Sequence, residues 1–91
     1  MTAYRVYGGA SEQVGSWLSP TAPESSAAAR SMLSLPPGNA ANFISEANIP
    51  AGTQIQFGQA AGGFGNTGGG MQIQLLGRIP TSSFGPGVPF P

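Results

Sequence analysis

The stretch FGNTGGGMQIQLL, from Phe64 to Leu76, joins a glycine-rich loop directly to a strand. Its first half consists mostly of Gly, Asn and Thr, which accept unusual backbone angles or let other groups approach the main chain closely. Apolar and polar residues then alternate, which is the period of a half-buried strand. The apolar residues of that strand are expected to face the core: Met71, Ile73 and Leu75. Gln72 and Gln74 share the other face, where amides serve either a solvent-facing surface or a ligand.

A second alternating segment, from Thr2 to Tyr7, predicts a strand that Gly8-Gly9 ends. This strand carries Arg5 in its middle. A guanidinium has five fixed N–H donors, which suit a pyrophosphate or a carboxylate and are costly to bury unpaired. Arg5 is therefore either a ligand-binding residue or an edge-strand residue that meets solvent or a glutamate.

The remaining segments predict one helix and further strands. Thr21-Ala-Pro-Glu24 has the pattern of a capping box with Thr21 as N-cap, which predicts a helix from Ala22 to Ser34. Residues 15–20 are expected to be extended, and strands are expected at Asn42–Ile49 and Gln54–Gln59, with Ile55 and Phe57 facing the core. A hairpin is the simplest arrangement for the last two strands.

Five strands and one helix give an α+β fold with a small β-rich core, and the tail from Thr81 to Pro91 is expected to lie extended across it. The 91 residues suffice for a single domain spanning 1–91.

The chain contains no Cys, His or Lys, and its charged residues are three Arg and three Glu. Zinc hydrolysis, Ser-His-Asp catalysis, Schiff-base chemistry and Walker-type phosphate binding each require a residue type that is absent. No metal site and no cofactor are therefore expected. The zero net charge argues against a nucleic-acid partner, and the lack of an apolar run of about 20 residues argues against a membrane segment.

A site built from arginine, amides, hydroxyls and aromatic rings suits cleavage of the N-glycosidic bond of NAD. Nicotinamide leaves a cationic pyridinium as a neutral molecule, so no general acid is needed, and the transition state resembles that of sugar hydrolysis. Arg5 is a candidate clamp for the pyrophosphate. Trp17, Phe64 or Tyr4 can supply an aromatic slot, and Gln72 can bond a ribose hydroxyl or orient the water.

Three segments of the chain, YRVYGG, GSWLSP and FGNTGGGMQIQLL, together resemble the tuberculosis necrotizing toxin family, the NAD(P)+ glycohydrolase domains of secreted bacterial polymorphic toxins. The resemblance covers essentially the whole chain. It implies a core related to ADP-ribosyltransferases, with NAD or NADP as substrate and nicotinamide and ADP-ribose as products. It also implies roles for particular residues: Arg5 and Gln72 are catalytic, and the expected substrate-binding residues are Tyr4, Ser16, Trp17, Phe64 and Gly70.

The resemblance further implies that the chain is the C-terminal part of a longer secreted protein that acts in the cytoplasm of a target cell. A cognate immunity protein would then protect the producer by covering the NAD cleft. Two other interpretations remain open. One is ADP-ribosyl transfer to a target through Glu46, which precedes Pro50-Ala51-Gly52-Thr53 in a predicted strand. The other is a non-enzymatic binding module, in which NAD binding does not depend on Arg5.

Overall fold

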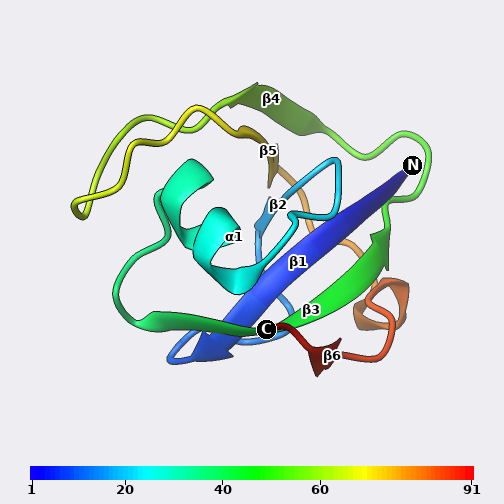
Figure 1. Ribbon diagram of the computed structural model, residues 1–91. Helices are drawn as coiled ribbons and strands as arrows, with labels where there is room; N and C mark the ends of the chain where they lie inside the picture. The colour runs from blue at the N-terminus through cyan, green and yellow to red at the C-terminus, as the bar shows by residue number, and fades with distance from the viewer.

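A computed structural model describes residues 1–91 and folds the chain into two antiparallel three-stranded sheets and one helix (Figure 1). This mostly β arrangement agrees with the predicted α+β class. The elements follow one another in the order β1 (Thr2–Gly9), β2 (Trp17–Leu18), α1 (Ser26–Met32), β3 (Asn39–Asn48), β4 (Ile55–Gln59), β5 (Met71–Leu75), the 3-10 turn η1 (Thr81–Ser83) and β6 (Val88–Pro89). No helix has the length and apolar character needed to cross a membrane.

The first sheet has the strand order β1-β3-β6. β1 and β3 pair from Thr2↔Asn48 to Tyr7↔Phe43, after which the register shifts before Gly9↔Asn39. The rings of Tyr7 and Phe43 stack with centroids 5.5 Å apart, as expected for directly opposed aromatic residues. Period-two alternation therefore located both strands correctly.

The second sheet has the order β2-β5-β4, so β4 pairs with β5 from Ile55↔Leu75 to Gln59↔Met71. The predicted hairpin between β3 and β4 is wrong. The glycine-rich segment 60–70 instead returns the chain for a β4–β5 hairpin, which the Ala60 N–H closes by donating to the Gly70 carbonyl at 2.8 Å. The turn at 50–53 only redirects the chain from one sheet to the other.

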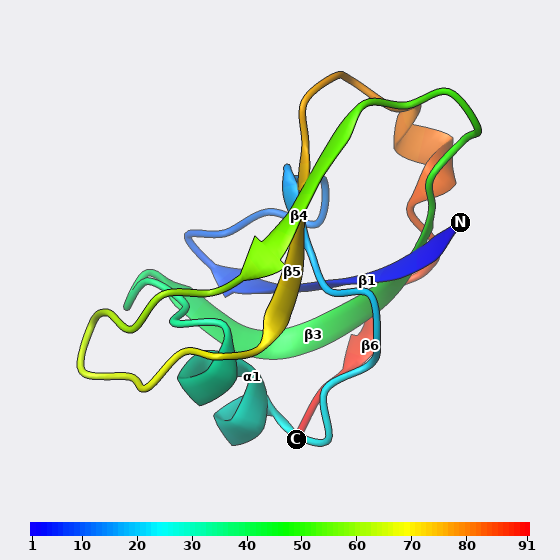
Figure 2. The same cartoon turned by 90° about the horizontal axis from the view of Figure 1, so that it is seen from above.

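The two sheets meet at Tyr4 and Ser19, which exchange backbone hydrogen bonds of 2.8 and 2.7 Å. In Figure 2, β4 and β5 run across β1 and β3 rather than along them. One buried cluster fills the space between the sheets: Ala3, Leu18, Ala47, Ile49, Ile73 and Phe84. Two residues predicted to face the core are instead about half exposed: Phe57 on the edge strand β4 at 50%, and Met71 at the start of β5 at 42%.

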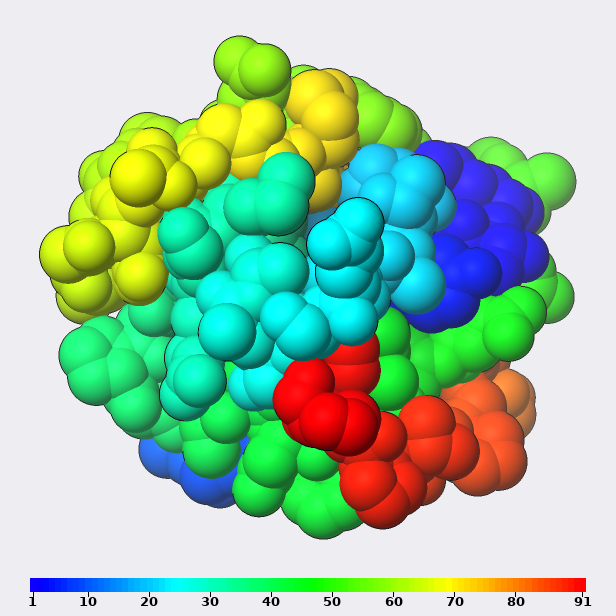
Figure 3. Space-filling view, in the orientation of Figure 1, coloured from blue at the N-terminus to red at the C-terminus, as the bar shows by residue number.

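A second cluster lies between the first sheet and α1 and consists of Val6, Ala29 and Ala41, with Leu33, Leu35, Ile44 and Phe90 packed against it. The C-terminal tail reaches this helix, because the Ser26 N–H donates to the Pro91 carbonyl at 2.7 Å. Figure 3 shows the C-terminal residues, in red, lying against the helical segment, in cyan. The tail therefore contributes to both clusters, through Phe84 and Phe90.

The helix is shorter than predicted and is capped by Ser25, not by Thr21. Ser25 has extended backbone angles, and its Oγ accepts a hydrogen bond from the Ala28 N–H at 3.0 Å. The predicted capping box fails because the carbonyl of Thr21 accepts a hydrogen bond from the Ser19 hydroxyl, in a non-helical segment. Ala29 is the buried residue of the helix, whereas Met32 is exposed.

The two candidate caps can be separated by substitution. Ser25→Ala is expected to lower the free energy of unfolding by about 1 kcal/mol, because the Ala28 N–H loses its acceptor. Thr21→Ala is expected to change it by less than about 0.5 kcal/mol, since its side chain caps nothing. Urea unfolding of the two variants measures both values, and equal losses would place the helix start elsewhere.

Candidate functional site

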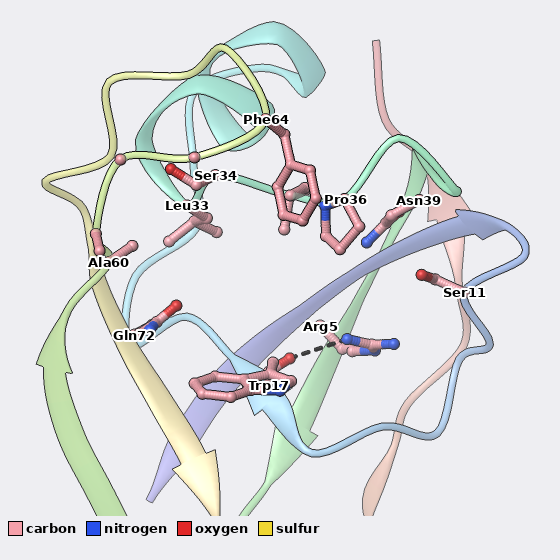
Figure 4. A pocket seen from close by; sticks show the side chains of 14 residues that line it. Arg5, Ser11, Trp17, Leu33, Ser34, Pro36, Asn39, Ala60, Phe64 and Gln72 are labelled. Carbon is pink, nitrogen blue, oxygen red and sulfur yellow. Dashed lines mark hydrogen bonds between the residues drawn. The ribbon is translucent and has the colours of Figure 1, made fainter.

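A cleft of about 400 Å³ opens where β1, β2 and β5 approach the segment after α1 and the loop after β4 (Figure 4). Both predicted catalytic residues, Arg5 and Gln72, line it, together with the predicted substrate-binding residues Trp17 and Phe64. The other residues of its lining are Ser11, Leu33, Ser34, Leu35, Pro36, Asn39, Ala60, Ala61, Gly62 and Gly63. No group of acidic side chains is placed to hold a metal ion.

Arg5 is held by backbone carbonyls, not by solvent or a glutamate. Its Nε and Nη2 donate to the Glu12 carbonyl at 3.2 and 3.0 Å, and its Nη1 donates to the Trp17 carbonyl at 3.1 Å. Gly15 lies against the flat face of the guanidinium, because a Cβ at that position would be 2.5 Å from Cζ. The arginine thus fixes the chain between β1 and β2.

The charge of Arg5 has no anionic neighbour to balance it. Only 9% of the residue is exposed, and burial lowers the pKa of the guanidinium below its ordinary value. Three of its five N–H donors are used by the carbonyls, which leaves two for another acceptor. A buried cation with spare donors beside a cleft is suited to bind an anion such as a pyrophosphate.

Phe64 stands at the tip of the glycine-rich loop and is 65% exposed. Gly63 and Asn66 exchange backbone hydrogen bonds around it, and Phe64 and Gly65 both have positive φ, +53° and +77°. Positive φ at both central positions is the pattern of a type I′ turn, in which the first position normally carries Asn, Asp or Gly. A phenylalanine there costs roughly 1–2 kcal/mol of backbone strain, and such outliers favour a functional explanation.

Gln72 lies near the start of β5 and is half-buried, and its side-chain amide makes no hydrogen bond within the chain. In Figure 4 it enters the cleft from one side and Arg5 from the other, with the Trp17 indole between them. Trp17 is 47% exposed, so its ring is open to the cleft. An amide donor and acceptor, an aromatic surface and a cation therefore converge on one space.

Three predicted substrate-binding residues do not line this cleft. Tyr4 lines a separate cavity of about 30 Å³ beneath it, with Arg5 and Gln72. Ser16 lines a hollow on another part of the surface, beside Arg78. Gly70 is buried beneath α1, where a Cβ would be 3.0 Å from the Met32 carbonyl oxygen.

Glu46, the residue required by the transferase interpretation, is also outside the cleft. It is exposed and lies opposite Tyr4 in the β1–β3 pair, next to Ser45, which lies opposite Arg5. Because neighbouring residues of a strand point to opposite faces, Glu46 points away from the face that carries Arg5. It lines a different hollow with Ile44 and Val88.

The sequence interpretation missed the wall formed by residues 33–39. Pro36 and Asn39 of this wall line the cleft. Asn39 is buried and braces this wall, since its amide donates to the Val6 carbonyl at 3.1 Å and accepts from the Ala41 N–H at 2.9 Å. Ser34 contributes a buried hydroxyl without a hydrogen-bond partner. The sequence analysis placed Ser34 at the end of the predicted helix, which gave no indication of a cleft.

Neither a protein-family model nor a curated protein nor a solved structure matches this chain.

The contact between Arg5 and Gly15 predicts that an alanine is much more destabilising at Gly15 than at Gly77. Gly15→Ala is expected to lower the free energy of unfolding by about 1–3 kcal/mol, because the added methyl group collides with the guanidinium. Gly77→Ala is the matched control, since nothing lies within 4 Å of a Cβ there, and a change below about 0.5 kcal/mol is expected. Urea unfolding of both variants measures these changes. Equal losses of unfolding free energy would refute the contact.

Proposed function

We propose that the chain is an NAD(P)+ glycohydrolase that cleaves the bond between nicotinamide and ribose. One observation carries the proposal: a single cleft collects a buried cation with free donors, two exposed aromatic rings and an unbonded strand amide. These groups match the parts of NAD in turn, namely the pyrophosphate, the nicotinamide ring and its ribose. The resemblance of the sequence to the tuberculosis necrotizing toxin family supports the same activity, and with it a relation to ADP-ribosyltransferases.

The proposed reaction needs no acid or metal from the protein. The C1′–N bond breaks with its electron pair moving to the pyridinium nitrogen, so that nicotinamide leaves neutral. Water forms the new C1′–O bond and releases a proton to solvent, which gives ADP-ribose. Binding by Arg5 holds the pyrophosphate, stacking on Trp17 or Phe64 orients the ring, and the Gln72 amide bonds a ribose hydroxyl or the water.

Two alternatives receive less support from the geometry. Transfer of ADP-ribose to a protein through Glu46 requires that residue beside the reacting ribose, whereas it faces a different hollow from Arg5 and Gln72. A binding module without catalysis would not need the Gln72 amide, free of hydrogen bonds, on the opposite side of the cleft from Arg5. Both alternatives are outcomes of the assay described below.

The same proposal implies where the protein acts and which partner it requires. A glycohydrolase of this kind acts as a toxin that depletes NAD in the cytoplasm of a target cell after delivery as part of a longer secreted protein. Its producer then requires an immunity protein that blocks the cleft. The half-exposed Trp17 and the largely exposed Phe64 at the cleft are suitable contacts for such an inhibitor.

The assay that tests the proposal is the release of nicotinamide and ADP-ribose from NAD and from NADP by the purified protein. Gln72→Ala is expected to lower kcat by about a hundredfold, because an amide that acts at the reacting ribose is lost. The matched control is Gln74→Ala, two residues along the same strand and outside the cleft, which is expected to leave kcat within about twofold. Arg5→Ala is less informative, because Arg5 also fixes the chain between β1 and β2.

The ratio of products separates the alternatives. Equal amounts of nicotinamide and ADP-ribose indicate hydrolysis, whereas a deficit of free ADP-ribose in the presence of an acceptor protein indicates transfer. No turnover by the folded protein with either dinucleotide would leave the binding module as the better explanation.

Phe64→Asn is expected to change stability and activity in opposite directions. Asn suits the first central position of a type I′ turn, so the free energy of unfolding should rise by about 1 kcal/mol. Loss of the ring removes a stacking surface, so KM for NAD should rise at least about fivefold. Urea unfolding and the nicotinamide assay measure the two effects. A stabilised variant with unchanged KM would show that the strained phenylalanine has no role in binding.

A further inference from the structure

The outer edge of β4 carries unpaired backbone groups. At the two ends of the β4–β5 pair, the Leu76 N–H donates to the Gln54 carbonyl at 3.0 Å and the Ala60 N–H donates to the Gly70 carbonyl at 2.8 Å. The even-numbered residues between them, Gln56 and Gly58, therefore bond to β5 as well. Hydrogen-bonded and non-hydrogen-bonded pairs alternate along an antiparallel ladder. The N–H and C=O groups of Ile55, Phe57 and Gln59 therefore point away from β5, toward the outer side of the sheet.

This edge lacks the features that usually prevent strands from pairing with one another. Natural edges are protected by charged residues, prolines, bulges or very short strands. β4 reads IQFGQ, and the whole segment from 47 to 77 contains no charged residue. By contrast β6, one of the two edge strands of the other sheet, is two residues long and contains Pro89.

The core is also left open beside this edge. The side chains of Phe57 and Met71 lie on the same face of the β4–β5 pair as Ile73, which is fully buried. Yet half of Phe57 and 42% of Met71 are exposed. Removing apolar side-chain surface from water is favourable, so a strand added at β4 would gain apolar contact as well as backbone hydrogen bonds.

The strand IQFGQ is complementary to itself in an antiparallel register centred on Phe57. In that register Phe57 faces Phe57 of a second copy, and Ile55 faces Gln59, so that each such pair exchanges two backbone hydrogen bonds. Gln56 faces Gly58, where nothing lies within 4 Å of the Cβ position, so the longer side chain has room.

We propose that β4 pairs with β4 of a second copy of this chain to form a symmetric dimer with one continuous sheet. A twofold interface of this kind uses the same patch on both subunits, which a strand complementary to itself satisfies. Ile55, Phe57 and Gln59 do not line the cleft, although Phe57 and Gln59 border a neighbouring hollow that Trp17 and Gln72 also line. The proposal is independent of the proposed enzymatic function.

Sedimentation velocity over about a hundredfold range of protein concentration tests the dimer, because its population follows mass action. The unmodified chain is expected to shift from one chain mass to twice that mass. Phe57→Lys should raise the dissociation constant at least about tenfold, because like charges directly opposite each other destabilise a strand pair. Gln59→Pro should do the same, since it removes an outward N–H and leaves the ladder to β5 intact.

Val88→Lys, at the edge of the other sheet and 51% exposed, is the matched control and should leave the dissociation constant unchanged. Amide hydrogen exchange provides a second readout, in which Phe57 and Gln59 become protected as the concentration rises. A monomer at every concentration with unprotected amides at these residues would overturn the proposal. So would a dimer that both Phe57→Lys and Gln59→Pro leave intact.

Discussion

The burial of one guanidinium is the constraint on which the rest of this structure depends. Arg5 lies in the middle of β1, where neighbouring strands would normally leave it no acceptors. The chain after β1 turns back so that the carbonyls of Glu12 and Trp17 meet the guanidinium. This fixes Trp17 at the start of β2, and two residues later Ser19 bonds to Tyr4 and joins the two sheets. A single buried cation therefore connects a loop, the sheet junction and the cleft.

The same residue explains how so uncharged a chain can offer the proposed binding site. Neutral carbonyls satisfy part of the hydrogen-bonding capacity of Arg5 without cancelling its charge, and burial makes that charge more effective. The opposite wall contributes an amide and aromatic rings rather than acids and bases. Such a set suits a reaction whose leaving group is already cationic, because orientation and electrostatic stabilisation are then all that the protein must supply.

Local patterns predicted the elements better than their partners. Period two located β1, β3 and β5, because alternation reflects burial on one face, a local property of the sequence. The partner of β4 was not predictable, since pairing depends on the path of the 60–70 loop. The helix start was misplaced because Thr21 and Ser25 are both chemically suitable caps and tertiary contacts select one. Arg5, singled out by its chemistry, and Gln72, singled out mainly by the family resemblance, both line the cleft, whereas the 33–39 wall has only a turn signature.

The distribution of charge has a consequence for how the domain responds to ionic strength. Five of the six charged side chains are exposed, and the sixth, Arg5, is buried and bonded to neutral oxygens. Screening by salt weakens interactions between exposed charges and reaches buried ones much less. The fold therefore contains little that salt can loosen, whereas an anion entering the cleft must compete with those in solution for the free donors of Arg5. With the proposed anionic substrate, salt concentration would therefore regulate occupancy of the cleft while the scaffold around it stays unchanged.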